Sequence, residues 1–84
     1  MNIQEVLIND IERIDTTDMG IGRIKRNLQL DDDVDVVDYC KNIILDKNST
    51  FTSKGKNYYI TRDCEQLTVN KSSFTIITAH IIKK

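Results

Sequence analysis

The chain has 84 residues, of which 39% are hydrophobic and 30% charged, and its 12 basic and 13 acidic residues leave a formal net charge of −1. This length fits one small domain, residues 1–84, and leaves no room for a second folded domain. No apolar run is long enough to cross a membrane, and the start MNIQEVLIND lacks the regions of a signal peptide. Two cysteines are too few for a disulfide framework. We therefore expect a cytoplasmic protein.

Residues 2–46 form a helical half, because their apolar residues recur with a period near 3.6. A first helix is predicted over about residues 2–14. A second, shorter helix follows candidate caps at Thr16, Thr17 and Asp18 and reaches Leu28. A third begins after a run of aspartates, which favour a helix N-terminus because they complement its dipole.

Residues 47–84 form a strand half, because the period changes to 2. The segments STFTS, NYYITR, QLTVN and SFTIITAHII are predicted strands, separated by short turns. Short turns favour an antiparallel meander. The sequence therefore predicts an α+β domain in which three N-terminal helices pack on one face of a three- or four-stranded antiparallel sheet.

Alternation assigns each strand residue to a face of that sheet. We expect the face toward the helices to carry Ile60, Leu67, Val69, Ile77 and Ile81. The open side is then expected to hold Gln66, Thr68, Thr78 and His80, with Tyr59 and Thr61 nearby. Apolar residues on the outer face would be contacts of a homodimer, and the candidates are Phe74, Ile76 and Ile82.

Charge divides sharply between the two halves. Residues 1–46 hold five cations against eleven acids, a net charge of −6, and residues 47–84 hold seven cations against two acids, a net charge of +5. A basic, polar sheet face attracts a polyanion such as RNA, DNA or a nucleotide, although lysines also protect sheet edges from aggregation. The residues expected to bind the ligand are Lys54, Lys56, Tyr59, Arg62, Thr68, Lys71, Thr78 and His80.

An enzymatic alternative rests on His80, the only histidine. A metal-independent ribonuclease needs an acid, a base and cations for the phosphorane, which His80, Thr78, Arg62 and Lys56 would supply. No glutamate clearly pairs with His80, and neither cysteine has the spacing of a zinc site. We therefore expect a binding protein without cofactor or metal rather than an enzyme.

A third hypothesis places a protein partner on the second helix, where Arg23, Lys25 and Arg26 gather in the stretch GIGRIKRNL. This stretch is not a dinucleotide fingerprint, because it lacks a third glycine and follows no strand. The aspartates that come next would repel a DNA backbone, which disfavours a helix-turn-helix.

The blocks TTDMGIGRIKRNLQL, DVVDYCKNIIL, KGKNYYITRD and LTVNKSSFTIITAH resemble a family of small bacterial proteins classified as a domain of unknown function, over about Ile11 to Lys83. That resemblance implies no activity. The layout is also similar to small ribonucleases and toxins of the barnase, colicin and RelE type, which would again implicate His80, Thr78, Arg62 and Lys56. A phage-encoded inhibitor of a bacterial defence system is a further alternative.

Overall fold

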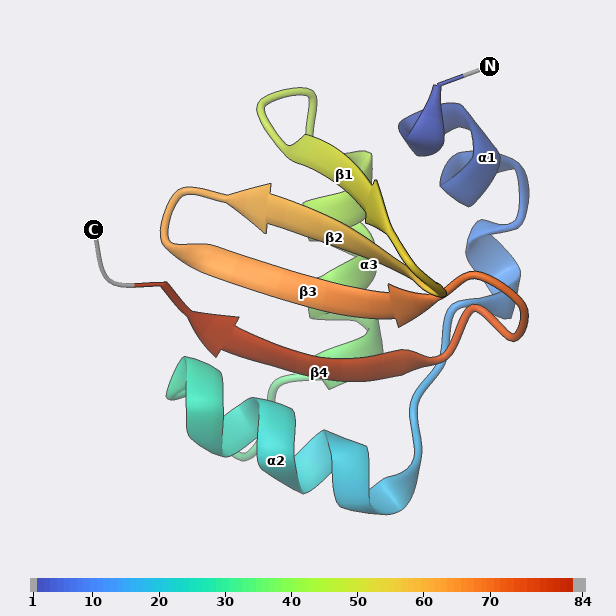
Figure 1. Ribbon diagram of the computed structural model, residues 1–84. Helices are drawn as coiled ribbons and strands as arrows, with labels where there is room; N and C mark the ends of the chain where they lie inside the picture. Colours follow the sequence, from blue (N-terminus) through green and yellow to red (C-terminus); the bar gives the residue numbers. More distant parts are fainter. Residues whose placement is uncertain (1, 83–84) are drawn as a thin grey trace.

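The computed structural model describes residues 2–82 and belongs to the α+β class that the sequence predicts. Its helices precede one four-stranded antiparallel sheet with the order β1-β2-β3-β4 (Figure 1). The helical elements are α1 (Ile3–Asn9), the 3-10 turn η1 (Ile11–Arg13), α2 (Asp18–Leu28) and α3 (Val36–Leu45). The strands are β1 (Thr50–Lys54), β2 (Asn57–Arg62), β3 (Glu65–Asn70) and β4 (Ile76–Ile81).

Side-chain caps start the three α-helices. The carboxamide of Asn2 accepts from the Glu5 amide, and the Thr17 hydroxyl accepts from the Gly20 amide. The carboxylate of Asp35 does the same for Asp38 at α3. Each cap satisfies an amide that the helix leaves without a partner.

The predicted first helix is too long. Instead of running to residue 14 it ends at Asn9, and η1 follows as a separate turn. The physical reason is a tertiary contact, because the main chain of Asp15 is extended beside Thr75 and accepts from the Ile76 amide at 2.8 Å. A helix that continued through Ile14 could not reach that position.

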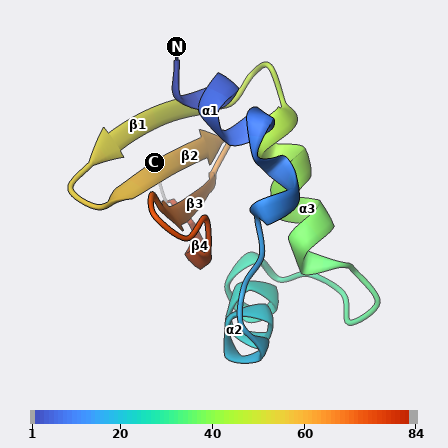
Figure 2. The ribbon, with the colours of Figure 1, turned by 90° about the vertical axis from the view of Figure 1, so that its right-hand side faces the viewer.

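The core lies between the helices and one set of strand side chains. As expected, Ile60, Leu67 and Val69 are fully buried. From the helical half they meet Leu7, Ile14, Ile24, Leu28, Val36, Cys40, Ile43 and Ile44. Figure 2 shows α1, η1 and α3 beside the sheet and α2 next to β4.

The faces predicted for the last strand are wrong at Ile76 and Ile77. The register shifts between Thr68 and Val69, which pair with Thr78 and Ile76, so Ile77 is the extra residue of a β-bulge. Ile76 is therefore buried, whereas Ile77 is 42% exposed. Ile81 lies opposite Glu65 on the predicted side, with Ala79, but it is 42% exposed at the end of the strand. Phe74 is also buried, which removes Phe74 and Ile76 as surface contacts of a dimer.

Strand β4 also begins later than predicted, because residues 71–73 form a turn. The Asn70 carboxamide oxygen organises this turn by accepting from the amides of Ser72 and Ser73. Phe74 has a positive φ of 56°, which directs its side chain into the core.

The outer edge of β4 is covered by the segment that leads into α2 and by α2 itself (Figure 1). The Thr16 hydroxyl donates to the Ile76 carbonyl at 2.9 Å, and the Asn27 carboxamide donates to the Ala79 carbonyl at 3.1 Å. With the Asp15 carbonyl on the Ile76 amide, these bonds satisfy main-chain groups that a sheet edge otherwise presents to solvent.

Candidate functional site

The strand register aligns eleven side chains on the face of the sheet opposite the core. Residues directly opposite each other on neighbouring strands share a face, so each cross-strand row can be read from the pairing. The three rows are Thr50, Thr61, Gln66 and His80, then Thr52, Tyr59, Thr68 and Thr78, then Lys54, Asn57 and Asn70. We call these residues the polar face. None of the eleven is acidic, and Tyr59 is the one Phe, Tyr or Trp residue among them.

The middle of the polar face is its most enclosed part. Thr68 is only 6% exposed and lies between Tyr59 and Thr78, both half-buried. In the neighbouring row, the Gln66 carboxamide donates to the Thr61 hydroxyl at 3.2 Å. Where they are accessible, the hydroxyl and amide groups of these rows can both donate to and accept from a ligand.

His80 lies on this face, as predicted, and is exposed opposite Gln66. Its neighbours in the rows are hydroxyl and amide side chains, with no carboxylate among them. Gln66 and Asn70 are four residues apart on β3, which corresponds to about 13 Å of strand. Lys56 lies at the Asn70 end, so the fold does not bring Lys56 beside His80.

A cationic cluster forms at the end of the sheet where the β1-β2 turn and the β3-β4 turn meet. The Lys71 amide donates to the Lys56 carbonyl at 2.9 Å, which fixes the two turns together. Gly55 has the positive φ, 60°, that the first position of such a two-residue turn favours. The Lys71 ammonium lies 5.3 Å from the centre of the Tyr58 ring. We call Lys54, Lys56 and Lys71 the lysine end.

Arg13 joins the lysine end, which sequence reasoning missed. Its guanidinium donates to the Ser72 carbonyl at 3.1 Å and lies 4.7 Å from the centre of the Phe74 ring. The residue is exposed and comes from η1, far from the turn in sequence. No local pattern signals such a contact. Two of the seven cations of the strand half, Lys83 and Lys84, lie outside the described residues.

Arg62 is placed elsewhere, although the sequence groups it with the lysines. It pairs with Glu65 at the opposite end of the sheet, in the row that ends at Ile81. Its guanidinium is 3.4 Å from the Asp46 carboxylate and 3.6 Å from that of Glu65, and it lies 5.8 Å from the centre of the Tyr39 ring. Arg62 therefore connects the β2-β3 hairpin to α3 rather than facing a ligand.

The groups around Arg62 perturb one another. The Tyr39 hydroxyl donates to Glu65 at 2.5 Å, and burial together with this bond raises the pKa of Tyr39. Burial lowers the pKa of Arg62, but Glu65, Tyr39 and Asp46 together outweigh it and the net shift is upward. Beneath them, burial and Glu65 raise the pKa of the Cys40 thiol to about 12. These shifts describe a structural cluster in which Arg62 stays charged and the Cys40 thiol stays protonated.

The basic residues of α2 form a separate surface. Arg23 and Arg26 are exposed, and the Lys25 ammonium donates to the Asp32 carbonyl at 2.7 Å just after the helix. They belong to the helix that runs along the β4 edge, whereas the lysine end belongs to the sheet turns.

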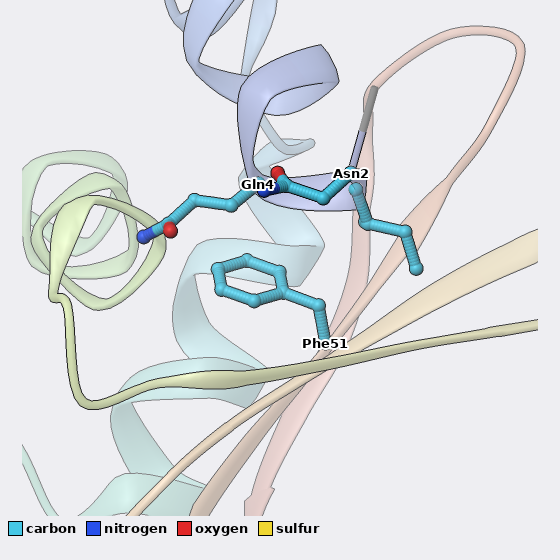
Figure 3. Close-up of a pocket in the computed structure, with 4 residues that line it drawn as sticks. Asn2, Gln4 and Phe51 are labelled. Carbon is cyan, nitrogen blue, oxygen red and sulfur yellow. The ribbon is translucent and has the colours of Figure 1, made fainter.

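A pocket that the sequence does not reveal lies between the start of α1 and β1 (Figure 3). Its volume is about 410 Å³, and it is lined by Asn2, Ile3, Gln4 and Phe51. The Gln4 carboxamide fixes this wall by donating to the carbonyls of Ile44 and Asp46, at 3.1 and 3.2 Å. The pocket is not part of the polar face, because Phe51 pairs with the buried Ile60 on the other side of the sheet.

Residues 2–82 contain neither a metal-binding cluster nor a membrane span. No three histidine, cysteine, aspartate or glutamate side chains in this range are grouped so as to hold a metal ion. None of the helices within it combines the length and the apolar composition that crossing a membrane requires.

A family model described as a protein of unknown function, DUF3781, matches residues 8–80. The chain therefore belongs to this family, which confirms the resemblance to a domain of unknown function. No curated protein and no solved structure matches it.

Proposed function

We propose that this member of the DUF3781 family is a binding module whose polar face and lysine end together bind a single-stranded polyanion, with RNA as the ligand class. The observation that carries the proposal is the register, which aligns eleven non-acidic polar side chains in rows, the last of which contains Lys54 and lies beside Lys56 and Lys71. In this reading the helices cover one face of the sheet and leave the polar face open.

Each part of the surface has a role in that proposal. The lysines neutralise phosphates, which supplies affinity that depends on salt. The hydroxyl and amide rows bind sugar and phosphate oxygens, and the exposed part of the Tyr59 ring stacks on a base, which is worth about 1–3 kcal/mol per base. With one aromatic ring and no row of base-reading groups, we expect little sequence preference.

The test is binding of a fluorescein-labelled single-stranded RNA by fluorescence anisotropy at two salt concentrations. For three lysine-phosphate contacts on a single strand, raising salt from about 50 to 200 mM should weaken binding roughly 20-fold. The double variant Lys56→Glu/Lys71→Glu should lose most of the affinity and flatten this salt dependence. Its control, Arg23→Glu/Arg26→Glu, changes the net charge equally on α2.

The outcomes separate the hypotheses. Equal losses in the two double variants would mean that only net charge matters, and selective loss in the α2 variant would move the site to the helix. The labelled RNA also reports catalysis when it is incubated with the unmodified protein and with His80→Ala. Cleavage that disappears in His80→Ala would establish the ribonuclease alternative. Unchanged binding in Lys56→Glu/Lys71→Glu would refute the proposed site.

A further inference from the structure

The two edges of the sheet differ in how their main-chain groups are satisfied. The β4 edge is bonded to Asp15, Thr16 and Asn27. Lys54 and Asn57 flank a two-residue turn and form a hydrogen-bonded pair. Along an antiparallel ladder such pairs alternate with pairs that form no hydrogen bond, and Phe51 and Ser53 belong to the second kind. Phe51 and Ser53 therefore direct their amides and carbonyls away from β2. In residues 2–82 no hydrogen bond occupies those four groups.

The pocket lies where the next strand would place a side chain. In an antiparallel or parallel pair, a residue opposite Phe51 points to the same side of the sheet as the Phe51 ring. That side holds the cavity of about 410 Å³ between Phe51 and Ile3 (Figure 3). An added strand would thus form main-chain bonds to β1 and place one apolar side chain in the pocket, which is how strand addition combines affinity with specificity.

Charge identifies the kind of strand that fits. β1 is preceded by Lys47 and ends at Lys54, with Lys56 in the following turn, and all three side chains are exposed. A second copy of this chain would bring the same cations to the same edge, and like charges across a strand pair are destabilising. A segment with acidic residues at both ends complements the edge.

We propose that β1 is a docking site for an extended acidic peptide, which adds a fifth strand to the sheet through Phe51 and Ser53 and inserts one apolar side chain between Phe51 and Ile3. This site shares Lys54 and Lys56 with the lysine end, but its main-chain bonds and its pocket belong to the sheet edge rather than to the polar face.

The probe is a synthetic nonapeptide of alternating threonine and valine, with a central leucine and a glutamate at each end. In an NMR titration of the ¹⁵N-labelled protein, we expect the Phe51 and Ser53 amides to shift and their hydrogen exchange to slow at least tenfold. The amides of Thr52 and Lys54, which already bond to β2, should change much less. A second peptide, N-methylated at the residues that face β1, should not bind, because it lacks the donors.

Matched variants locate the site. Ser53→Pro removes an outward amide without removing a ladder bond, so it should abolish peptide binding while Ser53→Ala leaves it intact. RNA binding should be unchanged in both variants, which keeps this result separate from the polyanion proposal. The proposal is overturned if the N-methylated peptide binds as well as its parent, if the shifts fall on Tyr59 and Thr68 instead, or if the nonapeptide does not bind at millimolar concentration.

Discussion

Alanine at Gly20 and alanine at Gly22 should change the stability of this protein in opposite directions. Both glycines lie near the start of α2, where alanine gains about 1 kcal/mol of helix propensity over glycine. At Gly22 a new Cβ meets nothing within 4 Å, so Gly22→Ala should stabilise by up to that amount. At Gly20 a Cβ would lie 2.2 Å from the Thr16 hydroxyl oxygen, which is too close for any contact.

The cost at Gly20 follows from the role of that hydroxyl. It donates to the Ile76 carbonyl on the β4 edge at 2.9 Å, and rotating it away leaves that part-buried carbonyl without its partner. Such a loss costs about 1–3 kcal/mol, against about 1 kcal/mol gained in propensity. We expect Gly20→Ala to destabilise by up to about 2 kcal/mol, measured by urea denaturation followed by circular dichroism.

A double-mutant cycle tests this reasoning. In a Thr16→Ala background both the clash and the hydrogen bond are gone, so Gly20→Ala should become stabilising, like Gly22→Ala. If Gly20→Ala has the same sign and size in both backgrounds, the close approach of Thr16 is not what requires glycine at this position.

The remaining predictions concern the interior and the turns. Arg62→Met should destabilise the protein by about 2 kcal/mol, because it leaves two partly buried carboxylates without a partner. That loss corresponds to a fall of roughly 8–16 °C in Tm. Unchanged stability together with a loss of RNA binding would show instead that Arg62 belongs to the ligand site. A thiol reagent should modify Cys64 at once and Cys40 only after unfolding, and labelling of both in the folded protein would contradict the burial of Cys40. Folding raises the pKa of Cys40 from near 9 to about 12, so the neutral thiol stabilises the folded state fully below pH 9. This stabilisation is lost as the pH rises toward 12. In thermal denaturation curves, Cys40→Ala should therefore flatten the decline of stability at alkaline pH. Gly55→Ala should destabilise by about 1 kcal/mol because φ is 60° there, and a neutral result would show that the turn relaxes.

The sequence by itself determined the elements and much of the polar face. Helical spacing and capping residues predicted α2 and α3, and alternation placed Ile60, Leu67 and Val69 in the core. Since Thr68 and His80 alternate with apolar neighbours, the period of 2 is enough to assign them to the opposite face. These features depend on residues near one another in the chain, where period and propensity act directly.

Only the tertiary structure decided the rest. One extra residue at Ile77 reverses the alternation at the start of β4, and no local signal marks it. Arg62 looks like any other cation of the strand half until α3 places Asp46 beside it, and Arg13 reaches the lysine end through a contact 59 residues away in sequence. The pocket and the open β1 edge likewise arise from how α1, α2 and the sheet pack. Such features require contacts between distant segments, and the period of the sequence carries no information about which segments will meet.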